Sequence, residues 1–145
     1  MTRMDERGMV SFMGLCALGT LLIFGMTLLY TVRSSVEKAG MFQNEKMLQQ
    51  IAENRLEQLS VQMEKDADFC RALEDDEAKQ LDSPEFQGVQ TASYVRKAGE
   101  RIFLLVRAEK QHKKSGRVLY MRVRGYLTKK TTEDGDRYVW SGRLP

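Results

Sequence analysis

The sequence of 145 residues has little of what catalysis and metal binding most often require: one histidine, two cysteines and no recognisable catalytic motif. His112 stands in a lysine-rich turn, so we expect it to be solvated rather than a base or a metal ligand. There is no G-x-S-x-G motif, no cysteine pair at metal-binding spacing and no glycine loop that would cradle a phosphate. The acidic run at residues 74–77 could hold a hard cation, but consecutive carboxylates near a helix end are more often a solvated face. These absences predict a protein that is not an enzyme and has no cofactor and no metal site.

The two cysteines do not form a disulfide framework. Cys16 lies within an apolar run and Cys70 stands alone in polar sequence, so a bridge between them would need implausible geometry. We expect Cys70 to be a free or buried thiol, with an intermolecular bridge as the alternative.

Charge is absent from residues 9–32, a run of 24 residues without Asp, Glu, Lys, Arg or His. A helix of that length covers roughly 36 Å, against about 30 Å for the hydrocarbon core of a bilayer. The alternative is a cleaved signal peptide, but its apolar region would be shorter and would end in small residues, whereas this segment runs into Val32 and Arg33. We therefore predict a leader at residues 1–8 and a transmembrane helix at 9–32. Basic residues flank the segment almost evenly, so charge does not set its orientation.

Proline is absent from residues 33–82, where Glu, Gln, Lys, Met, Leu and Ala favour helix. Apolar residues recur there at spacings of three and four, which predicts an amphipathic helical stalk. The stripe consists of Met41, Leu48, Ala52, Leu56, Leu59 and Met63, with Ile51 beside it. Arg55 and Gln62 interrupt a strict heptad, so we expect packing on the helix's own domain and on neighbours rather than a free-standing coiled coil. Only Gly40 separates the stalk from the membrane segment, so the sequence allows one continuous helix.

After Ser83 and Pro84 the hydrophobic period changes from 3.6 to 2, which indicates β-strands. Alternation predicts strands at 101–109, 117–129 and 137–144, with 91–96 as a candidate fourth, and turn residues at 113–116 and 133–136. The apolar face holds Ile102, Leu104, Val106, Ala108, Leu119, Met121, Val123 and Leu127. Such a face needs a cover, which the amphipathic helix supplies. The predicted fold class is α+β: a long N-terminal helix packed on a small antiparallel sheet of three to four strands in residues 83–145.

Charge is divided unevenly along the chain. Residues 33–85 hold 7 Lys and Arg against 13 Asp and Glu, net −6, whereas residues 86–145 hold 14 against 5, net +9. The basic region contains a candidate surface in which tyrosines alternate with cations: Arg107, Arg122, Arg124, Lys129, Lys130, Tyr120 and Tyr126. Three interpretations stay open. They are a solvated face that deters edge pairing, docking on the acidic stalk of a neighbouring subunit, and contact with the phosphates and bases of DNA.

The N-terminal residues Glu6-Arg7-Gly8 are followed at once by Met9-Val10-Ser11-Phe12, and residues 50–57 read QIAENRLE. This pattern resembles the type IV pilin-like proteins, most closely the PilX-type minor pilins and the minor pseudopilins of type II secretion. The resemblance implies that a prepilin peptidase cleaves between Gly8 and Met9, the two processing residues, and that Met9 becomes a methylated N-terminus. Met13 stands where major pilins have glutamate, which implies a minor subunit.

The resemblance also implies a role in assembly: priming, capping or modifying a type IV pilus, a competence pseudopilus or a type II secretion pseudopilus. The implied partners are membrane lipid, other pilin-like subunits, pilus assembly proteins and prepilin peptidase. The implied location is the cytoplasmic membrane of a bacterium, crossed once, with the C-terminal domain extracytoplasmic. The same outline fits an alternative, a bitopic membrane scaffold of a cell-division-type complex with a coiled coil and a small outer domain.

Overall fold

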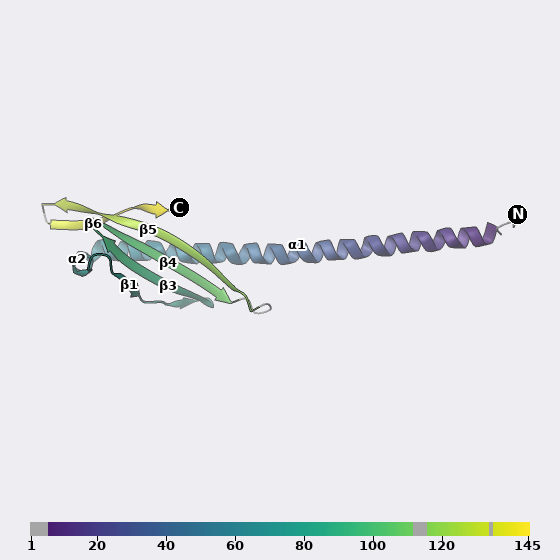
Figure 1. Ribbon diagram of the computed structural model, residues 1–145, viewed down its shortest axis with the longest axis horizontal. Helices are drawn as coiled ribbons and strands as arrows, with labels where there is room; N and C mark the ends of the chain where they lie inside the picture. Colours follow the sequence, from purple (N-terminus) through teal and green to yellow (C-terminus); the bar gives the residue numbers. More distant parts are fainter. Residues whose placement is uncertain (1–5, 112–115, 134) are drawn as a thin grey trace. The chain divides into compact units, whose positions relative to one another are not determined.

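The computed structural model describes residues 6–111, 116–133 and 135–145, and the side chains from residue 8 onward within these ranges. His112 and most of the predicted turn at 113–116 lie outside the described residues. The chain divides into two compact units, residues 1–42 and 43–145. Helix α1, Glu6–Lys65, forms the described part of the first unit and continues without a break into the second (Figure 1). The continuous helix that the sequence allowed is therefore confirmed.

The second unit holds a short helix, α2 (Ala67–Ala72), and a six-stranded antiparallel sheet. The strands are β1 (Ala78–Leu81), β2 (Glu85–Phe86), β3 (Val89–Ala98), β4 (Arg101–Gln111), β5 (Val118–Thr132) and β6 (Gly135–Leu144). Their order is β1-β3-β4-β5-β6, and β2 also pairs with β3. The four long strands form a meander, as the alternation of residues predicted. The α+β class and the antiparallel sheet are confirmed, whereas the strand count is higher than predicted.

One face of the sheet packs on the second half of α1, and this contact makes the core. On the helix the buried residues are Leu48, Ala52, Leu56, Leu59 and Met63. On the sheet they include Val89, Val95, Ile102, Leu104, Val106, Ala108 and Leu127. The predicted stripe is thus confirmed from Leu48 onward, while Met41 is 46% exposed and belongs to the first unit. Of the apolar residues predicted on β5, Leu127 is fully buried, and three are partly buried against the core: Leu119, Met121 and Val123.

The prediction of helix over residues 33–82 holds for α1 up to Lys65 and for the separate helix α2, and it was wrong beyond Ala72. Residues 33–82 favour helix by composition, but α1 ends at Lys65, and the Asp66 carboxylate accepts a hydrogen bond from the Phe69 backbone N–H (3.0 Å) to cap α2. Asp76 has a left-handed φ of 70°, and the following residues pair with β3 as β1. Local helix propensity is weak, and the open edge of β3 offers four register pairs that outweigh it.

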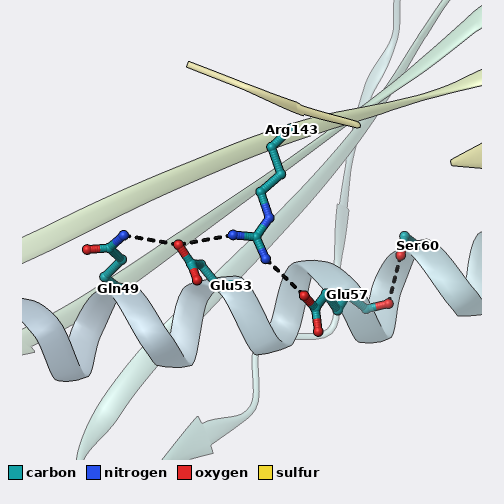
Figure 2. A network of polar contacts seen from close by, with 5 residues as sticks. All are labelled: Gln49, Glu53, Glu57, Ser60 and Arg143. Atoms are coloured by element: carbon teal, nitrogen blue, oxygen red, sulfur yellow. Dashed lines mark hydrogen bonds and ion pairs between the residues drawn. The ribbon is translucent and has the colours of Figure 1, made fainter. Parts of the chain in front are cut away.

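Charged side chains fasten β6 to α1 across the apolar contact. Figure 2 shows Arg143 donating to two carboxylates one helical turn apart, Glu53 (3.1 Å) and Glu57 (2.9 Å). Gln49 donates to the same oxygen of Glu53, Oε1 (3.0 Å), and the backbone N–H of Trp140 donates to Glu64 (2.7 Å). These bonds fix which face of β6 meets the helix.

Candidate functional site

The first candidate site is the apolar segment at residues 9–32 of α1. Every residue in it is exposed except the half-buried Gly19 and Gly25. The hydroxyls of Thr20, Thr27 and Thr31 donate to helix carbonyls three or four residues earlier, at 2.7–2.8 Å, so these side chains need no water. The helix that contains this segment is long and apolar enough to cross a membrane. An exposed apolar surface of this size requires lipid or protein around it.

The predicted processing residues lie at the start of this segment. Gly8 and Met9 both belong to α1, and both are exposed. A Cβ added at Gly8 would meet nothing within 4 Å, so the fold itself does not demand glycine there. Residues 1–5 of the predicted leader lie outside the described residues.

The second candidate site is the face of the sheet that points away from α1, which we call the outer face. Side chains alternate between faces along a strand, so the cross-strand register assigns each residue to one of them. The residues on the outer face of β3 to β5 are Gln90, Ala92, Tyr94, Arg96, Ala98, Arg101, Phe103, Leu105, Arg107, Glu109, Gln111, Val118, Tyr120, Arg122, Arg124, Tyr126, Thr128 and Lys130. None of these residues belongs to the buried core of the second unit.

Of the seven residues predicted for a basic surface, the structure brings six to the outer face. The placement of Lys129 on this surface was wrong, because Lys129 lies on the inner side of β5 with Leu127 and pairs there with Asp136 (2.7 Å). That pairing raises the pKa of Lys129 and lowers the pKa of Asp136, in each case through the hydrogen bond between them first. The alternation along β5 could have shown that Lys129 faces inward, because Lys129 is two residues from the inward-facing Leu127.

Arginines of the outer face lie over tyrosine rings. The guanidinium carbons of Arg107 and Arg122 are 5.3 and 5.4 Å from the centre of the Tyr120 ring, and that of Arg101 is 5.6 Å from the Tyr126 ring. These are cation–π contacts, which attract because a ring face is partly negative. Sequence reasoning missed Arg101 and the ring of Phe103, which is 6.3 Å from that of Tyr126. Their even spacing from Arg107 along β4 is the signal that could have found them.

A depression of about 530 Å³ lies on the same face beside the arginines. Its apolar lining comes from Tyr94, Phe103 and Leu105. It is also lined by two charged side chains, Arg96 and Arg124. Arg96 pairs with Asp76 (2.5 Å), and Arg124 donates to the carbonyl of Pro145 (2.7 Å). The depression therefore combines flat apolar groups with guanidinium groups, which suits a ligand that is both planar and anionic.

The acidic charge of residues 33–85 lies beyond the end of α1. Residues 33–65 hold five acidic and five basic residues, so the net −6 comes entirely from residues 66–85, with eight acidic and two basic. Half of those eight carboxylates are engaged within the second unit. Asp66 caps α2, Asp68 pairs with Arg71, Asp75 accepts from the backbone N–H of Gly99, and Asp76 pairs with Arg96. Within the described part of the chain no group of three His, Cys, Asp or Glu is placed to hold a metal ion.

The thiol of Cys70 is buried in the core and free, as one of the two sequence alternatives predicted. Burial, with the nearby carboxylate of Asp66, raises the pKa of the thiol to about 11. A neutral, enclosed thiol is a poor nucleophile and a poor partner for an intermolecular bridge. Cys70 therefore acts as a small apolar residue beside Met63.

Helix and sheet together define an α+β domain carried on a helix that is apolar enough to span a membrane. Comparisons of the chain with family models, with curated proteins and with solved structures found no match.

Proposed function

We propose that the chain is a minor pilin-like subunit that takes part in assembling a type IV pilus, a competence pseudopilus or a type II secretion pseudopilus. One observation carries the proposal. A single helix supplies both an uncharged segment with exposed apolar side chains and the helix that covers the inner face of an antiparallel sheet. A segment of this kind is stable in lipid, and it is equally stable when it packs with like segments in a fibre.

The proposed role is in priming, capping or modifying a fibre rather than in forming its bulk. Met13 occupies the fifth position after Gly8, where the carboxylate of a major pilin would neutralise the amine of a neighbouring subunit. An uncharged thioether cannot do this. The corresponding location is the cytoplasmic membrane, with the sheet domain outside, and the proposed partners are other pilin-like subunits, assembly proteins and prepilin peptidase.

The test is the N-terminus of the full chain, extracted from membranes of cells with and without a prepilin peptidase. With the peptidase, intact-mass analysis should show loss of residues 1–8 and one added methyl group on Met9. Gly8→Leu should block cleavage, although the fold has room for the side chain. Gly40→Ala is the matched control, an exposed helical glycine that should leave cleavage unchanged.

A chain that keeps residues 1–8 in the presence of an active peptidase would overturn the proposal. It would favour the bitopic scaffold instead, and the acidic Asp5 and Glu6 are the observation on its side, because pilin-like leaders are mainly basic.

A further inference from the structure

The outer face of the sheet holds positive charge that the protein itself does not neutralise. Arg107 and Arg122 are directly opposite each other in the register of β4 and β5, and both lie over the ring of Tyr120. Like charges in opposite positions of neighbouring strands destabilise a sheet. Glu109 pairs with Arg107. No carboxylate of the described residues pairs with Arg122 or with Arg101.

The arrangement of these cations continues along β5. Arg124 lies two residues beyond Arg122 on the same face, roughly 7 Å further at the rise of a β-strand. Tyr120 and Tyr126 stand at the two ends of this row, about 20 Å apart by the same rise. The row thus offers two aromatic rings with guanidinium groups between them, and the depression lined by Tyr94 and Phe103 lies beside it.

We propose that the outer face binds single-stranded nucleic acid, with Arg122, Arg124 and Arg101 contacting phosphates and Tyr120 and Tyr126 stacking on bases. A planar guanidinium group can donate two parallel hydrogen bonds to two oxygens of one phosphate. Base stacking on aromatic side chains is the second ingredient of single-strand binding, and it tolerates any sequence. Tyr120 is 58% exposed, and Tyr126 is half-buried. An incoming phosphate also neutralises Arg122, which lies opposite Arg107 and, unlike Arg107, has no carboxylate partner among the described residues. The inference does not depend on the proposed role in fibre assembly.

An acidic segment of a second copy is the competing occupant, and two observations disfavour it. Four of the eight carboxylates in residues 66–85 are already engaged within their own chain. Carboxylates also make no use of the rings of Tyr120, Tyr126 and Phe103, which a nucleobase can stack on.

The experiment measures fluorescence anisotropy of a labelled oligothymidylate of about 20 nucleotides, titrated with the full chain in detergent at several salt concentrations. The wild-type chain should bind, with an affinity that falls as salt rises. Arg122→Ala should weaken binding and reduce the magnitude of the salt slope by about 0.7, the value for one phosphate contact on a single strand. Tyr120→Leu should weaken binding by about tenfold with the slope unchanged, because it removes stacking and keeps the charges.

Two variants serve as controls. Arg33→Ala removes the same charge from a side chain that is 83% exposed outside the sheet, and it should leave affinity within about twofold. Arg122→Lys keeps the charge and loses the planar group, so it should retain the salt slope and bind less tightly. Circular dichroism of each variant checks that the sheet is folded.

Three results would overturn the inference. One is no binding by the folded wild-type chain at low salt, and another is equal affinity for Arg122→Ala, Tyr120→Leu and Arg33→Ala. The third is competition by polyglutamate as effective as that by unlabelled oligothymidylate of equal charge, which would assign the face to an acidic protein segment instead.

Discussion

Replacing Leu56 by alanine is the sharpest test of the helix-to-sheet contact. Leu56 is fully buried in the middle of the apolar stripe on α1, between Ala52 and Leu59, which are also buried. Truncating a buried leucine to alanine costs about 2–5 kcal/mol, because transfer free energy is lost and a cavity remains. We take about 3 kcal/mol, since neighbours on both sides of Leu56 are fixed by the same helix and cannot collapse into the space.

A loss of about 3 kcal/mol changes the unfolding equilibrium on the order of a hundredfold, which is a large part of the 5–15 kcal/mol that holds a typical domain together. Trp140 is the single tryptophan of the chain, and it packs against the core, so its fluorescence reports on the second unit alone. The assay is urea unfolding of the full chain in detergent, followed by this fluorescence. The transition midpoint should fall while its slope stays the same.

Val61→Ala is the matched control, because Val61 lies on the same helix but is 49% exposed. It should change the free energy of unfolding by well under 1 kcal/mol. If Leu56→Ala costs no more than Val61→Ala, α1 does not cover the sheet, and the reasoning about the core is refuted.

Three further predictions follow from the second unit. Arg143→Ala should cost about 1 kcal/mol by urea unfolding, and the cost should shrink as pH falls below about 4. This sign follows because hydrogen bonding by Gln49 and Arg143 lowers the pKa of Glu53 in the folded state, so the stabilisation is present above the unfolded pKa and disappears as the folded carboxylate is protonated. Gly125→Ala should lower the midpoint of thermal unfolding, because the new Cβ would clash with the ring of Trp140; an unchanged midpoint would contradict that contact. Cys70, in a chain whose other cysteine is serine, should react with a thiol reagent at pH 8 only after denaturant is added, and rapid labelling of the folded chain would show that the core is open.

Sequence periodicity predicted those parts of the fold in which the burial of a residue follows from its position within a single helix or strand. The spacing from Leu48 to Met63 identified the buried stripe of α1, and the alternation from Ile102 to Ala108 identified the inner face of β4. β1 and β2 escaped prediction because they are short and polar and exist only through the edge of β3. No local pattern marks a strand of that kind.

The candidate site, too, could be predicted from the sequence only in part. The basic and aromatic residues of β5 were visible from alternation, but the opposition of Arg107 and Arg122 depends on the register between two strands. That register follows from a turn and from core packing, and it shifts every pair if it slips by one residue. The contacts of Arg143 with Glu53 and Glu57 likewise join residues 90 and 86 positions apart. The sequence can identify such residues as candidates, but their contacts with one another are known only from the fold.

The two proposals concern different parts of the molecule, since assembly would involve α1 and ligand binding would involve the outer face of the sheet. The inner face is committed to α1, whose apolar segment is the proposed fibre and membrane element, whereas the outer face contributes nothing to the buried core. An exposed residue of the outer face such as Arg122 can therefore be changed at little cost in stability, because surface substitutions usually stay within about 0.5 kcal/mol. Arg122→Ala should therefore weaken nucleic-acid binding and leave assembly nearly unchanged. Gly8→Leu should impair assembly and leave nucleic-acid binding nearly unchanged. A chain in which both properties fail together would have lost its fold, which the fluorescence of Trp140 distinguishes.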